Sequence, residues 1–215
     1  MKNNFEYEIH MIEENNEIFN RINGKSYVKN PDISIDELRY IKLNYYDFNN
    51  NICYGELIVN ESIVEDIVYI FSELFINKYQ IHSIKLIDEY EAENQNEADY
   101  KSMLDNNTSS FNYRIIKNTN DLSYHAYGLA IDINPLNNPY IININGKLDY
   151  DSLTKEELYY AMNRDENIPH VITHNDLVYK LFIERGFEWG GDWNPKYKSL
   201  DYQHFEKRNV KKSIN

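Results

Sequence analysis

The feature that most constrains the fold is the stretch from residue 38 to residue 75, where the hydrophobic pattern changes from that of strands to that of a helix. Residues 38–48 and 52–59 are rich in aromatic and β-branched side chains and flank an Asn-Asn-Asn turn, which predicts a β-hairpin. Beyond Asn60, a predicted helix cap, apolar residues recur at helical spacing: Ile63, Val64, Ile67, Val68, Phe71, Leu74 and Phe75. This order favours an α+β fold around a mixed or antiparallel sheet.

Weaker patterns elsewhere predict shorter elements. Strands are expected at residues 81–87, 111–116, 129–134 and 203–205. A second amphipathic helix carries Leu177, Val178, Leu181 and Phe182, and Gly186 suits its left-handed C-terminal residue. The acidic residues 88–99 predict a loop or solvated helix with surface charges. We expect a helical or loop-like N-terminal lead-in over residues 1–34, one domain over residues 35–207 and a basic tail over residues 208–215.

Composition removes several classes of protein. The 215 residues include 35 acidic and 22 basic side chains, and the resulting net charge of −13 repels nucleic-acid phosphates. The single cysteine, Cys53, excludes an intramolecular disulfide and a cysteine-built zinc site. Apolar runs are too short to span a bilayer. The N-terminus shows no secretory signal, so we expect that the protein is made without one or that the sequence omits it.

The segment of residues 123–134 can bring a histidine and a carboxylate together. On a strand that begins near residue 129, Asp132 projects away from the core because successive side chains alternate between the two faces. Small Ala130 leaves space beside it, and Gly128 permits a sharp bend that returns His125 over the same face. The alternative is a satisfied core histidine and an aspartate that caps a turn.

A second segment, at residues 201–206, carries similar chemistry. If its last residues form a strand, His204 and Glu206 share one face while Phe205 packs inward, and Asp201 lies three residues before His204. Two histidines and one carboxylate are a common catalytic zinc set that leaves the fourth position open for water. A further carboxylate can then serve as the base for that water.

Together these residues resemble a family of zinc peptidases, the D-alanyl-D-alanine carboxypeptidases and L-alanyl-D-glutamate endopeptidases. The family includes relatives of the vancomycin-resistance D,D-dipeptidases and of phage endolysins, and it shares the fold of the hedgehog signalling domain. Its signature S-x-H-x-x-G-x-A-x-D is matched by Ser123, His125, Gly128, Ala130 and Asp132. Residues 105–114 resemble the family's arginine-bearing strand, and residues 187–193 resemble its Trp-Gly-Gly-Asp-Trp loop. At the second motif, Asp201 replaces the Glu of the dipeptidases, as in the endolysin-like branch.

The resemblance covers roughly residues 35–207 and implies a central, mainly antiparallel sheet flanked by helices. It also implies that one Zn²⁺ binds through His125, Asp132 and His204, with Asp201 as general base and Arg114 as the cation that polarises the scissile carbonyl. Arg suits that role because its fork is planar and permanently charged. A surface salt bridge is the alternative for Arg114.

Other residues near these motifs have more than one interpretation. Ser123 suits a turn or a hydroxyl that supports a ligand better than a nucleophile, and Glu206 either competes with Asp201 as base or orients a ligand. Trp189 and Trp193 either line a substrate cleft or pack as an aromatic corner. His170 and His174 lie four residues apart, a spacing that can place two metal ligands on one face of a helix. A proline before them and helix-cap residues between and after them argue against metal binding by this pair.

The leading functional hypothesis is a zinc peptidase that acts on peptidoglycan stem peptides, most simply as a D-Ala-D-Ala carboxypeptidase. The alternatives are an L-Ala-D-Glu endopeptidase and a non-catalytic, zinc-stabilised binding domain of the kind that the hedgehog relatives illustrate. We expect a monomer without nucleic-acid partners or a membrane span. The resemblance places it at the cell wall or outside the cell, while the lack of a visible signal leaves the cytoplasm open.

Overall fold

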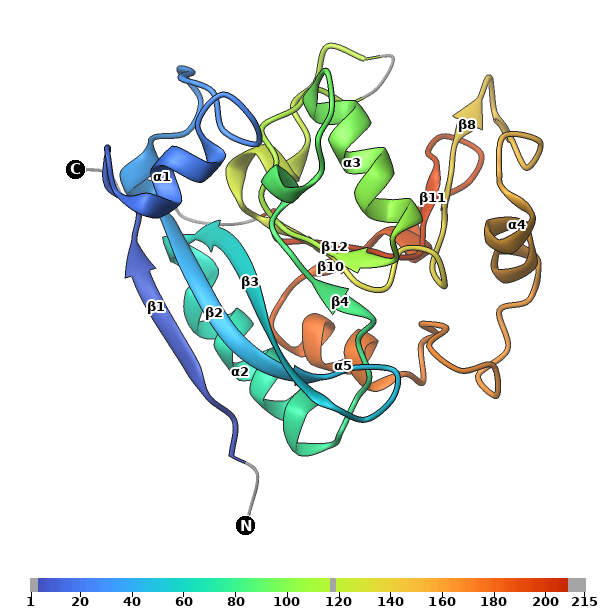
Figure 1. The fold of residues 1–215 in the computed structure, drawn as a ribbon. Coiled ribbons are helices and arrows are strands. Elements are labelled where there is room, and N and C mark those ends of the chain that lie inside the picture. The colour runs from blue at the N-terminus through green and yellow to red at the C-terminus, as the bar shows by residue number, and fades with distance from the viewer. Residues whose placement is uncertain (1–3, 117–118, 209–215) are drawn as a thin grey trace.

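The first layer of the structure is the predicted hairpin with one added strand. The computed structural model describes residues 4–116 and 119–208. Strands β2 (Leu38–Tyr46) and β3 (Ile52–Asn60) pair antiparallel, and β1 (Tyr7–Met11) pairs antiparallel with the other edge of β2 (Figure 1). The turn between β2 and β3 includes Asn50 at a φ of +61°, a conformation that asparagine tolerates. This sheet confirms the hairpin and adds a strand to the lead-in.

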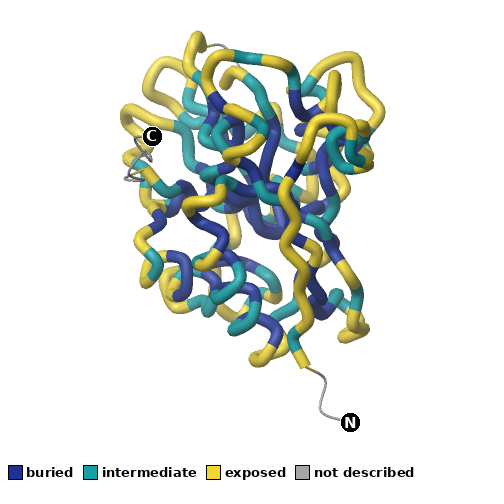
Figure 2. Tube along the Cα trace, turned by 90° about the vertical axis from the view of Figure 1, so that its left-hand side faces the viewer, coloured by how far each residue is buried: buried dark blue, intermediate teal, exposed yellow. Residues whose placement is uncertain are grey.

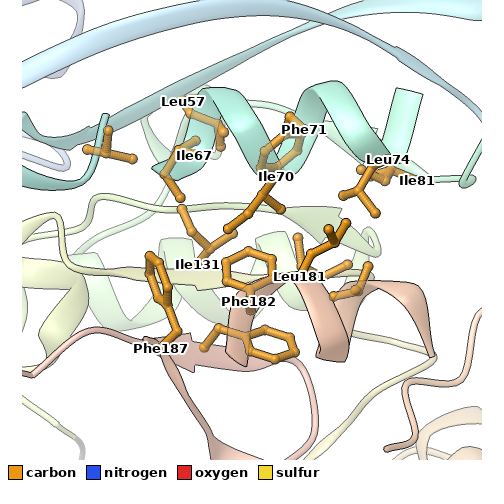
Figure 3. Packing of buried hydrophobic residues seen from close by; sticks show 14 of the residues in the cluster. Leu57, Ile67, Ile70, Phe71, Leu74, Ile81, Ile131, Leu181, Phe182 and Phe187 are labelled. Carbon is orange, nitrogen blue, oxygen red and sulfur yellow. The ribbon is translucent and has the colours of Figure 1, made fainter. Parts of the chain in front are cut away.

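Helix α2 (Val64–Ile76) joins this sheet to the rest of the molecule. It follows a short 3-10 helix, Glu61–Ile63, whose first turn is capped by the side chain of Asn60, as predicted. Its apolar face packs between the sheet and helix α5 (Leu177–Glu184). Figure 3 shows Ile67, Ile70 and Phe71 of α2 directed toward Ile131 and Phe182. Burying an aromatic or branched side chain of this size contributes about 1.5–3 kcal/mol.

The second layer is a small antiparallel sheet with the strand order β10-β12-β6. Its strands are β6 (Ala130–Asp132), β10 (Glu188–Trp189) and β12 (His204–Glu206). Phe205 is fully buried and stacks on Phe182 with ring centroids 4.3 Å apart, so the inward side of β12 is anchored in the core. The opposite side of this sheet therefore holds its polar residues in fixed positions.

The remaining elements are short. The helices are α1 (Glu17–Ile22), α3 (Gln95–Leu104) and α4 (Lys155–Met162). Two-residue strands pair as β4 (Ser83–Ile84) with β5 (Asn107–Thr108), β7 (Tyr140–Ile141) with β11 (Leu200–Asp201), and β8 (Asn143–Ile144) with β9 (Lys147–Leu148). Further 3-10 turns are Ile35–Glu37, Ile87–Glu89, Tyr124–Tyr127 and Gly190–Asp192. The strands are thus divided among several small sheets, and β4–β5 is parallel, which corrects the expectation of one central sheet.

Several predicted elements are confirmed. Helix α5 spans the predicted apolar residues, and Gly186 follows it at a φ of +78°. The predicted strands at residues 129–134 and 203–205 are β6 and β12, each shifted by one or two residues. The mixture of helices and strands confirms the α+β class.

Other predictions were wrong in extent or kind. Of residues 81–87, only Ser83 and Ile84 form a strand, because the chain turns into a 3-10 helix at Ile87. Residues 111–116 form no strand and make one isolated bridge, Ile115 to Leu122. The acidic stretch was wrongly predicted to carry only surface charges, since Asp88 and Asp99 are buried.

Burial follows this architecture. The core is continuous through the middle of the molecule, while β1 is exposed along its length (Figure 2). A second hydrophobic cluster lies between α1 and the hairpin and includes Ile22, Leu38 and Phe111. None of the helices formed by residues 4–116 and 119–208 has the length and hydropathy needed to cross a bilayer. Most of the basic tail, residues 209–215, lies outside the described residues.

Candidate metal centre

The first ligand-bearing segment is a capped 3-10 turn followed by strand β6. Ser123 precedes the turn, and its hydroxyl accepts a hydrogen bond from the backbone N–H of His125 at 3.3 Å. Gly128 ends the turn at a φ of +66°, and a Cβ there would lie 2.6 Å from the backbone nitrogen of Asn60. Only glycine satisfies both demands. The bend therefore returns His125 toward the strand, as the sequence predicted.

Strand pairing brings the two motifs together. In the antiparallel register of β6 and β12, Asp132 lies directly opposite His204. Asp132 Oδ1 is 2.9 Å from His204 Nδ1 and 3.2 Å from His125 Nε2, and the two imidazole nitrogens are 3.2 Å apart. All three side chains are buried. They form the one group of possible metal ligands found among the described residues.

The outer nitrogen of each imidazole is hydrogen-bonded, which leaves the inner one free to bind a metal. His125 Nδ1 donates to the backbone carbonyl of Ser110, so its Nε2 carries the lone pair. His204 Nε2 lies 3.0 Å from Glu206 Oε2, which directs Nδ1 inward. Carboxylates and carbonyls hold metal-binding histidines in this way. Two nitrogens and one carboxylate oxygen match the donor set of a catalytic zinc site.

Electrostatic interactions within this cluster favour the protonated form of His204 when no metal is bound. Burial opposes the charged form of His204, but its hydrogen bonds to Asp132 and Glu206 outweigh that cost and raise its pKa to about 10. Burial alone would raise the pKa of Asp132, yet the two histidines lower it below the usual range. A metal cation must therefore displace the His204 proton, which makes its affinity dependent on pH.

Asp201 and Glu206 differ in what already occupies their oxygens. Glu206 contacts His204 and Arg208, and these contacts lower its pKa despite burial. Asp201 is buried on β11 opposite Tyr140, and its Oδ1 has no hydrogen-bond partner. Burial raises the pKa of Asp201 to about 8, against the charge of His204. Asp201 is thus the carboxyl group with a free oxygen, and Glu206 orients His204.

Arg114 lies on an irregular segment and not on the expected strand. Its Nη2 is 2.9 Å from Asp99 Oδ2 of α3, and both side chains are largely buried. Its backbone carbonyl accepts a hydrogen bond from the N–H of Ser123 at 3.1 Å, at the start of the His125 turn. The Arg114 charge opposes the effect of burial on the pKa of Asp201, which burial raises. The alternative interpretation, a surface salt bridge, is wrong in its location, because this ion pair is largely buried.

The Trp-Gly-Gly-Asp-Trp loop packs one tryptophan into the core and holds the other at the site. Trp189 is 4% exposed and donates its indole N–H to the carbonyl of Tyr202 at 2.8 Å, as a packed aromatic corner does. Trp193 lies beside His204 with ring centroids 5.5 Å apart. A Cβ on Gly190 would lie 2.5 Å from the Asp201 carbonyl, and one on Gly191 would lie 2.4 Å from the Trp189 ring. Both glycines are required for this close packing.

The two other histidines considered from the sequence lie apart from the cluster and outside helices. His170 stacks on Phe48 with ring centroids 3.6 Å apart, and His174 Nε2 is 2.6 Å from Asp192 Oδ1. The residues between them form no helix, so the spacing of four does not place the two side chains on one helix face.

Gln203 is a site residue that sequence reasoning missed. Its Nε2 donates to Asp132 Oδ2 at 3.2 Å, so it holds the carboxylate oxygen that faces away from the histidines. Eight buried side-chain polar atoms among the described residues lack a partner, and four belong to residues around the cluster: Arg114, Trp193, Asp201 and Gln203. Such atoms are rare in folded proteins and call for a specific explanation.

The fold and this cluster define a class of protein: an α+β domain with a buried group of side chains that could hold a metal ion, and a buried carboxyl group with one unpartnered oxygen near it. Comparison with protein-family models agrees, because residues 117–207 match the model described as D-alanyl-D-alanine carboxypeptidase. The matched region is 91 of the 215 residues, and it includes the three candidate ligands and Asp201. No curated protein and no solved structure gave a match.

Proposed function

We propose that this protein is a zinc peptidase that cleaves peptidoglycan stem peptides, most simply a D-Ala-D-Ala carboxypeptidase, at the cell wall or outside the cell. The observation that carries the proposal is the convergence of two oriented imidazoles and one carboxylate, together with the buried Asp201, whose Oδ1 has no hydrogen-bond partner. His125, Asp132 and His204 would hold the metal. When bound, zinc supplies a Lewis acid that activates water and polarises a carbonyl.

The residues of the chain then divide the remaining work. Asp201 accepts a proton from the attacking water as the water oxygen bonds to the scissile carbonyl carbon. Asp201 gives that proton to the leaving amine as the C–N bond breaks, so the products are a carboxyl group and an amine. Arg114 stabilises the negative charge that develops on the carbonyl oxygen, an interaction that is stronger in the transition state than in the substrate.

Two alternatives rest on the same residues. An L-Ala-D-Glu endopeptidase would use the same chemistry on an internal bond, and the aspartate at position 201 favours it by resemblance to the endolysin-like branch. A non-catalytic zinc-stabilised domain needs the ligands but has no use for an unpaired buried carboxyl group. Leaving such a group buried without a partner is costly, which favours an enzyme.

Digestion of purified muropeptides tests the proposal. The zinc-loaded protein should remove a terminal alanine or cut internally, and a mass spectrum of the products distinguishes the two. A chelator should abolish cleavage and added zinc should restore it. Asp201→Asn should keep the metal and lose about 10²–10⁴-fold in kcat, the range for general acid–base assistance. Zinc-loaded protein that leaves every stem peptide intact would contradict the proposal.

A further inference from the structure

Helix α3 lies outside the region matched by the family model, yet its Asp99 contacts Arg114 and its Met103 Sδ lies 3.2 Å from Gln203 Nε2. Its N-terminus is capped by the side chain of Asn94, which accepts a hydrogen bond from the N–H of Glu97 at 3.0 Å. Asn112 donates to the carbonyl of Gln95 at 3.0 Å, and Asn107 donates to the hydroxyl of Ser102 at 3.0 Å. The helix is therefore fixed at both ends to the segment that leads to residue 114.

The charged residues of α3 lie in two different environments. Glu97 and Lys101 form an exposed pair at 2.7 Å with i,i+4 spacing, the kind of contact that contributes little. Asp99 is buried, and its carboxylate contacts Arg114 at 2.9 Å. Burying a carboxylate is costly unless it is paired. The position of Asp99 is thus explained by its contact with Arg114.

Arg114 is held from two directions. Ser123 fixes its backbone, and Asp99 fixes the end of its side chain through Nη2. Its Nε is buried and has no partner in the described structure. A buried donor without a partner is rare in folded proteins and calls for a specific explanation.

We propose that Asp99 is a positioning residue that sets the orientation of Arg114 toward the scissile carbonyl. The inference rests on the proposed function, because it assigns Asp99 to the same site. A displacement of about 1 Å in such a group can cost about 10²-fold in rate, since transition-state stabilisation depends on alignment. Asp99 itself contacts neither substrate nor metal.

Asp99→Asn tests this role, and Glu97→Gln on the same helix is the matched control. Asp99→Asn should lower kcat about 10–100-fold with KM within about threefold, while Glu97→Gln should leave both within about twofold. A merely structural ion pair would lower the melting temperature and leave the kcat of the folded fraction unchanged. Asp99→Glu, which keeps the charge one methylene further out, should retain more kcat than Asp99→Asn.

A readout without substrate separates this inference from the proposed function. The NMR resonance of the Arg114 Nε–H group can be identified because it is lost in Arg114→Lys. It should be sharp in the wild-type protein and exchange-broadened in Asp99→Asn and Asp99→Glu. If the wild-type protein cleaves no stem peptide, the proposed function fails and the resonance still tests the contact. An unchanged resonance in either Asp99 variant, or an equal fall of kcat in Glu97→Gln, would overturn the role of Asp99.

Discussion

At the scale of residues, the ligand assignment leads to a graded prediction for metal affinity. His204→Ala removes one of three protein ligands and should abolish tight zinc binding. Glu206→Gln keeps the ligand but weakens its orientation, so zinc affinity should fall about 10–100-fold. Competition with a chromophoric chelator measures both. Full zinc occupancy in His204→Ala would show that the metal lies elsewhere.

The sequence located much of this site because its residues lie in two short local patterns. Each of the three candidate ligands could be named from spacing, strand alternation and the Gly128 bend, together with the family resemblance. Asp99 and Gln203 could not, because their roles depend on contacts made by a helix and a turn whose packing no local pattern specifies. The buried Asp99 also lies in an acidic stretch that was predicted to be exposed at the surface.

At the scale of elements, helix α5 carries a prediction about pH. Asp176 caps the helix by accepting from the N–H of Val178 at 2.8 Å, and burial raises its pKa to about 6. A carboxyl group with a pKa higher in the folded than in the unfolded state binds more protons when folded, so stability falls as pH rises from about 4 to about 6. Asp176→Asn keeps a capping oxygen and removes this loss.

We therefore expect Asp176→Asn to be close to the wild-type protein at pH 4 and more stable at pH 7, by on the order of 1–3 kcal/mol. Urea unfolding of both proteins at the two pH values measures the difference. A difference that does not change with pH would show that Asp176 does not titrate in this range.

Elements were predictable where their pattern is long. The nine-residue strands β2 and β3 and helix α2 each repeat their period several times, which separates strand from helix. Strands of two residues, such as β4 and β5, are too short to show an alternating pattern, and their pairing is set by tertiary contacts. Strand β1 was missed although Tyr7, Ile9 and Met11 alternate with Glu8 and His10, because the strand is short and both of its faces are exposed.

At the scale of the whole molecule, one ion-pair cluster fastens α1 to the hairpin. Arg21 donates to both oxygens of Glu56, at 2.8 and 3.0 Å, and lies 3.4 Å from the buried Asp88. Arg21→Ala should cost about 1–3 kcal/mol, because the buried Asp88 loses its Arg21 contact and Glu56 keeps only the hydrogen bond from the Tyr40 hydroxyl. Lys101→Ala, in an exposed pair, should cost less than about 1 kcal/mol. Equal small losses in urea unfolding would show that α1 is only loosely attached.

The pairing of β1 with β2 has a further consequence for protein engineering. Strand β1 satisfies the backbone N–H and C=O groups along one edge of β2, and it presents Glu8 and His10 to solvent. A chain shortened to begin at residue 35 would leave the edge of β2 open along residues 39–43, which pair with β1. Open edges of this length template pairing with other chains and cause aggregation. Strand β1 thus protects this edge of β2 from pairing with other chains, and it should be kept in any shortened version of the protein.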